Sequence, residues 1–453
     1  MDVSIVGSGY VGTTAAACLA DHGHRVVNVE IDEGIVAAIN AGEAPIHEPG
    51  LAERIERHGG DRLRATTDYD AVRQTAVTLL CLPTPQAADG SLDLTAIRAG
   101  SESLGRALAG LDRSHVVAVK STVLPGTTTD VVGEIVGRES GLAVGEDLLL
   151  AANPEFQRAG TAVTDFENPD KIVIGARDDR AVATLRELYA ELIEGEGPRP
   201  LEDGDNLAVE GEGDRPGEGG DPHVVETGIP EAELIKYANN AFLAAKLSIV
   251  NELGNASKEY GADARAVLDA VGLDGRIGSR YMRSGLGWGG SCLPKDVDAL
   301  RAGLREEGYE PELLDAVVAV NDRQPRRLVD LLARHVDLDG ARVAVLGLAF
   351  KPDTDDVRGS RALDVVEHLR AAGAEVVAYD PVAAENALER DPDLSVAPTA
   401  SAALSGADAA VIATPWDEFE SLSFDGMDRR VVIDGRGIDV DRDALEVYEG
   451  LCW

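Results

Sequence analysis

Positive charge is scarce in this chain, and lysine is scarcer still. Asp and Glu number 81 against 42 Lys and Arg, a net charge of −39, and only seven of the 42 cations are Lys. Nucleic acids and anionic membranes are bound by basic surfaces, so the composition argues against both as partners. A chain this acidic and lysine-poor is typical of adaptation to high salt, with an ordinary acidic protein as the alternative.

If surface lysines have been largely removed, those that remain are enriched in functions that need an amine. An ammonium group can bind or stabilise an anion as a compact point charge. The seven are Lys120, Lys171, Lys236, Lys246, Lys258, Lys295 and Lys351.

Cysteine is also rare, and its spacing excludes several chemistries. The four cysteines form no C-x-x-C pair and the eight His show no metal-ligand spacing, so we expect neither a zinc site nor any other metal. Few cysteines in 453 residues fit a reducing compartment. A strand is expected from residue 2, which leaves no signal peptide, and no apolar run reaches the roughly 20 residues that cross a membrane. We therefore expect a cytoplasmic protein.

The N-terminal region predicts a dinucleotide-binding fold. An apolar strand at 2–6 leads into Gly-Ser-Gly-Tyr-Val-Gly, followed by an alanine-rich helix to about residue 21 and a second strand at 25–30 that ends in Glu30. This is the dinucleotide fingerprint in its required setting, and an acid at Glu30 favours NAD over NADP. The expected cofactor contacts of the turn are Gly7, Gly9, Tyr10, Val11 and Gly12.

Strands and helices continue to alternate, with strands expected at 76–82, 115–120, 148–152 and 171–175. In open parallel sheets, ligands bind beyond the carboxyl ends of the strands. For Thr84 and Ser121, a cap or turn role is as compatible with the sequence as a ligand contact. Five polar residues fall at such ends and together outline one cleft edge: Glu30, Thr84, Ser121, Thr122 and Glu155.

The composition of the chain changes after residue 193. Residues 194–222 are acidic and rich in Gly and Pro, and they predict a flexible insertion. A long helix is expected at 230–260, with Lys236 and Asn240 on one face. Helices at 264–271, 294–307 and 311–335 precede a second α/β unit. That unit lacks the three-glycine turn, so no second dinucleotide site is expected, and its loop-end cations Lys351, Arg358 and Arg436 suit another phosphate-bearing ligand.

Residues 285–296 read Gly-Leu-Gly-Trp-Gly-Gly-Ser-Cys-Leu-Pro-Lys-Asp. Pro294 suits a first helical turn, which places Cys292 at a helix N-terminus beside Lys295. A helix N-terminus and a neighbouring ammonium both favour the nucleophilic thiolate. A turn holding an inert thiol is the alternative, and the glycines and the Lys-Asp pair favour a nucleophile.

With these residues assembled, the chain resembles the UDP-glucose 6-dehydrogenases, within the UDP-glucose/GDP-mannose dehydrogenase family. The resemblance runs nearly end to end and lapses only in the acidic insertion. The motifs that carry it are Gly7–Gly12, Pro45–Leu51, Lys120–Val123, Asn153–Phe156, Lys236–Asn240, Arg276–Gly278, Gly287–Asp296, Gly347–Arg358 and Asp434–Arg436.

The resemblance implies an α/β fold with two Rossmann-like parallel-sheet domains, joined by a long central helix and a helical dimerisation segment. The expected domains are an NAD-binding domain (1–199), the acidic insertion (200–222), a central helical domain with the Cys loop (223–335) and a UDP-sugar-binding domain (336–453). It also implies four-electron oxidation of UDP-glucose to UDP-glucuronate with two NAD, and a homodimer or larger homo-oligomer.

The resemblance also assigns residues to the chemistry. A water held by Thr122 and Asp296 would be the base, Cys292 would form the thiohemiacetal and thioester, and Glu155 would assist hydrolysis. The implied catalytic set is Cys292, Lys236, Asn240, Asp296, Thr122 and Glu155. The implied substrate contacts are Glu155, Phe156, Gln157, Lys236, Arg276 from the partner subunit, Tyr281, Gly285, Gly289, Lys351 and Arg436, with Arg358 on NAD.

Two positions depart from the family pattern, and other functions stay open. Ala159 replaces a family Glu, and Trp288 replaces the usual Phe, which would narrow the loop beside the sugar. One alternative is the same chemistry on a UDP-N-acetylhexosamine or on GDP-mannose; Phe156 after Glu155 disfavours the former. Others are a non-catalytic nucleotide-sugar-binding protein and a simple two-electron dehydrogenase, in which Cys292 would be idle.

Overall fold

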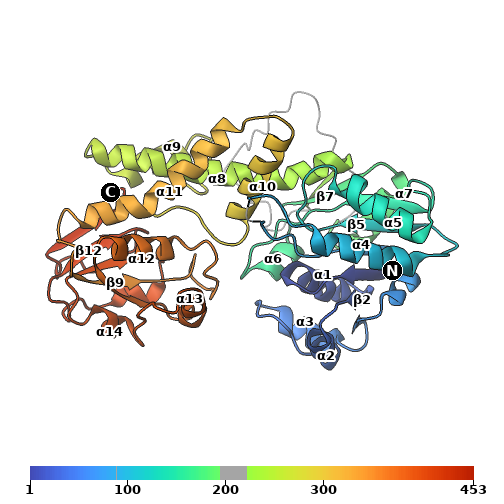
Figure 1. Cartoon of the computed structure of the whole chain (residues 1–453), viewed down its shortest axis with the longest axis horizontal. Helices are drawn as coiled ribbons and strands as arrows, with labels where there is room; N and C mark the ends of the chain where they lie inside the picture. The colour runs from blue at the N-terminus through green and yellow to red at the C-terminus, as the bar shows by residue number, and fades with distance from the viewer. Residues whose placement is uncertain (88, 194–221) are drawn as a thin grey trace. The chain divides into compact units, whose positions relative to one another are not determined.

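The computed structural model describes residues 1–87, 89–193 and 222–453, so the expected insertion at 200–222 lies outside the described residues except for Pro222. These residues form two compact units, which divide between Asn239 and Asn240 inside the long helix α8 (Ile229–Glu259) (Figure 1). None of the helices within these ranges combines the length and apolarity needed to span a bilayer.

Among the described residues, the first unit is built on an eight-stranded sheet with the order β3-β2-β1-β4-β5-β6-β7-β8. The strands expected from the sequence are confirmed with small shifts at their ends, whereas β3 and β8 are absent from the sequence prediction. The strands are β1 (Asp2–Val6), β2 (Arg25–Val29), β3 (Leu63–Thr66), β4 (Val77–Leu80), β5 (His115–Val119), β6 (Leu148–Ala152), β7 (Lys171–Ala176) and β8 (His223–Thr227).

One pair departs from the all-parallel sheet that the sequence predicts: β6 and β7 are antiparallel. The residues that join them contain the short helix α6 (Ala162–Glu167). The register pairs Ala152 with Gly175, so the start of β7 extends past the carboxyl end of β6. Lys171, the first residue of β7, is therefore carried to the ligand-binding edge of the sheet.

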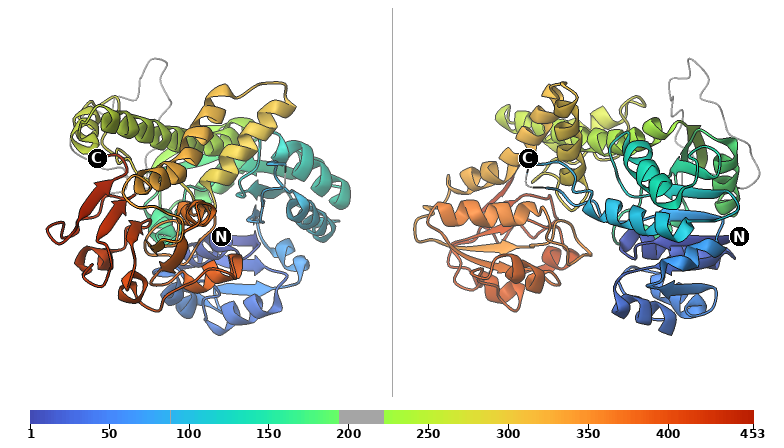
Figure 2. Two further views of the ribbon diagram at one scale, coloured as in Figure 1. Left: turned by 60° about the vertical axis from the view of Figure 1, so that its left-hand side comes forward. Right: turned by 45° about the vertical axis from the view of Figure 1, so that its right-hand side comes forward.

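Helices cover both faces of this sheet (Figures 1 and 2). One apolar core contains side chains of α1, α2, α3, α6 and α7, and the other contains side chains of α4, α5 and the start of α8. Both cores are dominated by fully buried Val, Ile, Leu and Ala, as expected for a sheet buried on both faces. The bounds are α1 (Tyr10–Asp21), α2 (Glu33–Ala41), α3 (Leu51–His58), α4 (Thr95–Leu108), α5 (Glu134–Ser140) and α7 (Asp179–Leu188).

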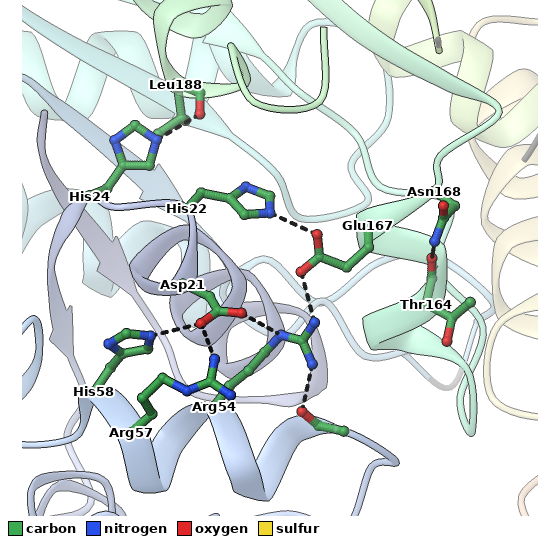
Figure 3. Close-up of polar contacts among 11 residues, drawn as sticks. Asp21, His22, His24, Arg54, Arg57, His58, Thr164, Glu167, Asn168 and Leu188 are labelled. Atoms are coloured by element: carbon green, nitrogen blue, oxygen red, sulfur yellow. Dashed lines mark hydrogen bonds and ion pairs between the residues drawn. The ribbon is translucent and has the colours of Figure 1, made fainter. Parts of the chain in front are cut away.

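A network of ion pairs ties α6 to α1 and α3 (Figure 3). The Glu167 carboxylate accepts hydrogen bonds from His22 Nε2 at 2.7 Å and Arg54 Nη2 at 3.2 Å. Arg54 Nε lies 3.4 Å from the Asp21 carboxylate, which also accepts from His58 Nε2 at 2.8 Å. Burial raises the pKa of Glu167. The hydrogen bond from His22 and the charges of His22 and Arg54 lower it by more, so the pKa lies below its ordinary value. The network fixes the end of the segment that starts at Asn153.

Among the described residues, the second unit contains the remainder of α8, six further α-helices and a five-stranded parallel sheet with the order β10-β9-β11-β12-β13. The predicted helices and strands are confirmed, whereas α13, α14 and β13 are absent from the prediction. The elements are α9 (Ala264–Gly272), α10 (Leu293–Glu306), α11 (Glu312–Leu332), β9 (Arg342–Leu346), α12 (Arg361–Ala371), β10 (Glu375–Tyr379), α13 (Ala384–Arg390), α14 (Ala400–Leu404), β11 (Ala409–Ile412), β12 (Val431–Asp434) and β13 (Val447–Gly450).

Asp380 follows the second strand of this sheet in chain order, as Glu30 follows that of the first. Its carboxylate is buried and accepts hydrogen bonds from Leu348 N at 2.7 Å and Ala349 N at 3.0 Å. It also accepts from Trp416 Nε1 and the backbone N–H groups of residues 382 and 383. With five donors on its two oxygens, this acid is committed to its own loop rather than to a ribose.

We predict that Asp380→Asn lowers the free energy of unfolding by about 3 kcal/mol, because the new NH₂ group faces buried N–H donors that lose their acceptor. Urea unfolding at fixed high salt measures the change. Glu389→Gln, an exposed substitution in α13, is the matched control and should leave the value unchanged. Equal stability of the two variants would contradict the role of Asp380.

Candidate functional site

The glycine turn at residues 7–12 has the geometry that a dinucleotide requires. Gly7 has φ +100°, and a Cβ there would lie 2.6 Å from Cys81 O. A Cβ at Gly12 would lie 2.0 Å from Gly7 O, so this glycine lets α1 pack onto the turn. A Cβ at Gly9 would meet nothing within 4 Å. The N-terminus of α1 therefore opens onto free space, as the pyrophosphate of a dinucleotide needs.

Glu30 holds the turn through hydrogen bonds from backbone N–H groups. Its Oε2 accepts from Ser8 N at 2.7 Å, and its Oε1 accepts from Ile31 N and Asp32 N at 2.7 and 3.1 Å. Beside it, Tyr10 is 45% exposed. The structure thus brings the predicted cofactor contacts of the first two strands to one edge.

The hydroxyls that follow β4 and β5 bind the backbone. Thr84 Oγ1 donates to Thr122 O at 2.9 Å, and Ser121 Oγ donates to Leu82 O at 2.7 Å. In the structure, both hydroxyls therefore stabilise turns, which is one of the two roles that the sequence left open. Thr122 lines a cavity of about 10 Å³ together with Lys236, which is room for about one water.

Glu155 and Lys236 form a nearly buried ion pair, with Lys236 Nζ 3.1 Å from Glu155 Oε1. The Lys236 side chain is 6% exposed and the Glu155 side chain is 11% exposed. The Lys236 ammonium also lies 5.4 Å from the centre of the Phe156 ring. Glu155 Oε2 accepts from Gln157 N, which fixes the turn. All four predicted substrate residues of this unit are therefore neighbours.

Lys171 joins this group although the sequence analysis left it out. Its Nζ lies 4.1 Å from the centre of the Phe156 ring and donates to Asn239 Oδ1 at 3.1 Å. Burial lowers its pKa, and the charge of Lys236 lowers it further. The scarcity of lysine was the available signal, since Lys171 is one of only seven.

Two buried acids that the sequence analysis also missed hold the loops of this edge. Glu48 accepts from Gly160 N at 3.0 Å and Ala162 N at 2.7 Å, and so caps α6. Glu233, on α8, accepts from the backbone N–H groups of residues 126 and 128, each at 2.8 Å. Each carboxylate satisfies two N–H groups at the start of a helix, where helical partners are missing.

In the second unit, Cys292 and Asp296 stand one turn apart at the start of α10. Cys292 is the N-cap residue, and Asp296 N donates to Cys292 O at 2.9 Å. Asp296 is 2% exposed and accepts from Asn240 Nδ2 at 2.6 Å and Lys295 Nζ at 2.5 Å. Lys295, for which only a general electrostatic role was predicted, is thus the counter-charge of a buried carboxylate.

Cys292 is the exposed cysteine of the four, and the other three are buried. Burial raises the pKa of Cys81 to about 12 and also raises the pKa of Cys18 and of Cys452. A raised pKa leaves those thiols protonated and poorly nucleophilic. Nucleophilic chemistry by a thiol therefore falls to Cys292.

The glycine loop before Cys292 packs tightly onto its own unit. A Cβ at Gly285 would lie 2.6 Å from Gly435 O, and one at Gly289 would lie 2.0 Å from Gly359 O. Buried amide side chains serve the loop backbone: Gly285 N donates to Asn251 Oδ1 at 2.8 Å, and Gln324 Nε2 donates to Gly285 O at 2.7 Å. At these two positions a side chain would clash with the neighbouring backbone, so close packing requires glycine.

The expectation that Trp288 narrows a sugar site is wrong. Its side chain is 5% exposed and packs with Ala244, Val297 and Val317. Its Nε1 donates to Ser248 Oγ at 2.9 Å. The larger ring fills the helical core behind the loop.

The other predicted ligand residues of this unit differ in their exposure. Arg276 is 89% exposed at its side chain and paired with Asp274, and Arg358 is 61% exposed and paired with Asp356. Tyr281 is partly exposed with φ 62°, and Lys351 Nζ lies 5.7 Å from the Phe350 ring. Arg436 binds Ala413 O and Gly287 O beneath the glycine loop.

Comparison with known proteins identifies relatives along the whole chain. Models of the UDP-glucose/GDP-mannose dehydrogenase family match residues 1–193 (NAD binding domain), 230–323 (central domain) and 344–440 (UDP binding domain). The chain is 56% identical over 453 residues to the UDP-glucose 6-dehydrogenase AglM of Haloferax volcanii, and 36% identical over 468 residues to a GDP-mannose 6-dehydrogenase of Azotobacter vinelandii, with full coverage of all chains.

A solved UDP-glucose dehydrogenase from the hyperthermophilic archaeon Pyrobaculum islandicum superimposes with a TM-score of 0.88. It is 39% identical, and the match covers 100% of this chain and 98% of that one. The Haloferax relative also agrees with the high-salt interpretation of the composition.

We predict that a small alkylating reagent modifies the native protein at Cys292 alone, because the other three thiols are buried and protonated. Peptide mass spectrometry after brief labelling gives the site. Cys292→Ser should abolish native labelling, while all remaining cysteines react once urea unfolds the chain. Labelling of Cys452 at the same rate as Cys292 would contradict the assignment.

Proposed function

Because the chain belongs to the UDP-glucose/GDP-mannose dehydrogenase family of NAD-dependent enzymes, we propose that it oxidises UDP-glucose to UDP-glucuronate. The reaction removes four electrons as two hydrides, and it consumes two NAD and one water for each sugar. The observation that carries the proposal is Cys292, an exposed thiol one turn before the buried Asp296. An aldehyde yields no second hydride until a nucleophile adds to it, and Cys292 provides one.

NAD is held, in this proposal, by the turn from Gly7 to Gly12 and by Glu30. The open space at Gly9 fits the pyrophosphate, and the Glu30 carboxylate fits the adenosine ribose hydroxyls. When bound, NAD accepts hydride from the substrate carbon. Thr84, Ser121 and Thr122 form the wall of this edge, and Arg358 is proposed to contact NAD from the second unit.

In the first oxidation, the 6-hydroxyl of glucose loses its proton to a water held by Thr122 and Asp296, while carbon 6 gives up a hydride. The Lys236 ammonium stabilises the oxygen on which negative charge develops. Lys236 and Asn240 lie four residues apart on α8, so both side chains project from the same face of the helix. Asn240 fixes the Asp296 carboxylate through its 2.6 Å hydrogen bond.

In the second oxidation, the Cys292 thiolate adds to the aldehyde carbon and forms a thiohemiacetal. The C–H bond of that carbon then gives up its hydride, and a thioester to Cys292 remains. Water attacks the thioester carbonyl, the C–S bond breaks, and the carboxylate and the thiol are released. Glu155 assists this hydrolysis as a general base. It forms an ion pair with Lys236, which lines the water-sized cavity.

The nucleotide is proposed to contact Lys351 and Arg436, and the sugar to contact Phe156, Gln157 and the glycine loop with Tyr281. A guanidinium fork and a compact ammonium suit the oxygens of a diphosphate. Arg276 projects from the surface of its own unit, which suits a contact with the substrate of a neighbouring subunit. GDP-mannose is the second candidate substrate, since a relative at 36% identity carries that name.

A homodimer is proposed from the exposed apolar stripe on α8. Phe242, Ile249 and Leu253 recur at spacings of seven and four, which places them on one face of the helix, and Tyr260 follows directly after its end. They are 72%, 59%, 40% and 90% exposed. An apolar stripe of this length on an acidic protein is typical of an interface, and a second copy can pair the same stripe with itself about a two-fold axis.

We predict two NADH for each UDP-glucose consumed by the wild type, measured by absorbance with limiting sugar nucleotide at high salt. Cys292→Ala should release no more than one, because the aldehyde has no nucleophile. Ser291→Ala, which keeps the thiol, should still release two. UDP-N-acetylglucosamine and GDP-mannose are the comparison substrates. Faster turnover of either one would make it the assigned substrate in place of UDP-glucose. Two NADH from Cys292→Ala would refute the covalent route.

We also predict that Phe242→Glu reduces the molar mass in solution to that of one chain, because it places a carboxylate within the apolar stripe. Light scattering coupled to gel filtration measures the mass. Val382→Glu, at an exposed apolar position of the second unit away from α8, is the matched control and should keep the wild-type mass. A wild type that is already monomeric at micromolar concentration would remove the dimer from the proposal.

A further inference from the structure

Lys171 is a charged residue of the candidate site that the proposed mechanism does not use. It is the first residue of β7. The antiparallel register pairs Ala152 of β6 with Gly175 of β7, and continuing that register past the end of β6 brings Phe156 opposite Lys171. The strand therefore delivers one of only seven lysines to the turn that carries Glu155 and Phe156.

Two ammonium groups lie near the Phe156 ring. Lys171 Nζ is 4.1 Å from the ring centre, and Lys236 Nζ is 5.4 Å from it. All three residues belong to the first unit. An aromatic ring attracts a cation through its quadrupole, so the ring offsets part of the repulsion between the two like charges.

The two lysines differ in their partners. Lys236 is paired with the Glu155 carboxylate at 3.1 Å, whereas Lys171 donates to Asn239 Oδ1 at 3.1 Å and contacts the aromatic ring. Burial lowers the pKa of Lys171, the adjacent Asp170 raises it in part, and the charge of Lys236 lowers it again. The charges of the two lysines therefore act on each other.

This coupling bears on the oxygen that Lys236 is proposed to stabilise. Repulsion between two ammonium groups is mutual, so the proton on Lys236 is easier to remove while Lys171 is charged. A more acidic ammonium is a stronger hydrogen-bond donor to an oxyanion. The second ammonium also adds to the positive field at that oxygen, and a field fixed in advance by the protein favours a transition state in which negative charge develops.

We propose that Lys171 is a positioning residue for the oxidation, which holds the Phe156 ring beside Lys236 and adds its own charge to the field at the developing oxyanion. Its hydrogen bond to Asn239 fixes it to α8, the helix that also carries Lys236. The inference rests on the proposed function for the reaction that it assists. The coupling between the two amines is tested without turnover.

Other titratable groups lie around the two lysines. Asp170 precedes the first lysine in sequence, and His223 is paired with it in the register of β8. Glu155 is bonded to the second lysine, and Glu233 lies one turn before it on α8. At ordinary pKa values, carboxylates are ionised and imidazole is neutral above about pH 8, so titration above that pH reports on the amines.

Trace labelling with acetic anhydride measures the coupling, because only an unprotonated amine reacts and peptide mass spectrometry has seven lysines to resolve. Labelling of Lys171 is followed from about pH 8 to 11 at one high potassium chloride concentration. Lys236→Met should raise its midpoint by about half a pH unit, because a like charge is lost. Two controls should leave it unchanged: Lys236→Arg keeps the charge, and Arg177→Met removes an exposed charge just beyond the opposite end of β7.

Lys236→Met also leaves Glu155 without its partner, and an unpaired carboxylate favours the protonated form of nearby amines. The double variant Glu155→Gln/Lys236→Met removes that carboxylate and should still show the upward shift of the Lys171 midpoint. An unshifted midpoint in the double variant overturns the proposal, whichever sugar nucleotide the chain oxidises.

In turnover, Lys171→Met removes the charge and keeps a side chain that packs well on an aromatic ring. We expect kcat with UDP-glucose to fall by about five- to tenfold, with KM within about twofold of wild type, because the field at the oxyanion is weaker. The loss of activity at high pH should begin at a higher pH. Lys171→Arg should restore both properties, and Arg177→Met should match the wild type. If Lys171→Met is unstable, Lys171→Gln, which retains a donor for Asn239, carries the same test.

The outcomes separate this inference from the proposed function. Equal losses in Lys171→Met and Lys171→Arg with an unchanged pH profile would show a purely structural lysine and overturn the proposal, and so would wild-type turnover by Lys171→Met. A wild type that yields no NADH from UDP-glucose, UDP-N-acetylglucosamine or GDP-mannose refutes the proposed function instead. The labelling result then still decides whether the two amines are coupled.

Discussion

The glycine loop that precedes Cys292 depends on hydrogen bonds that it cannot make for itself. A segment with so many glycines has no regular structure to satisfy its N–H and C=O groups, and when buried these groups require partners. Amide side chains supply them: Asn251 and Gln324 hold Gly285, and Asn321 both accepts from Trp288 N and donates to Trp288 O. The position of the candidate nucleophile therefore follows from amides on α8 and α11.

The same solution recurs with carboxylates. Glu48, Glu233 and Asp380 are buried, and each accepts backbone N–H groups at the start of a loop or helix. A carboxylate satisfied in this way needs no cation nearby, which suits a chain in which cations are few. The consequence is that lysines and arginines are available at the ligand edges. Lys171, which lies beside Phe156 and donates to an amide oxygen, is the clearest case.

Local pattern predicted most of the fold and part of the site. The turn from Gly7 to Gly12, the acid at Glu30 and the helix start after Cys292 each depend on neighbours in sequence, so short motifs were sufficient. Lys171 was missed because a residue at the start of a parallel strand lies at the far edge of a sheet, and only the antiparallel register of β7 brings it to the near edge. The buried place of Trp288 depends on α8 and α11, far away in the sequence.

Asp380 bears on the history of the second sheet. Its five donors, together with fully buried Leu348 and Ala349, close the turn after β9, whereas the turn after β1 is open at Gly9. To regain a dinucleotide site, this half of the chain would have to lose that carboxylate before a cofactor could replace its contacts. Each single step would produce a less stable protein. A dinucleotide site and the stability that Asp380 supplies are therefore mutually exclusive in this half of the chain.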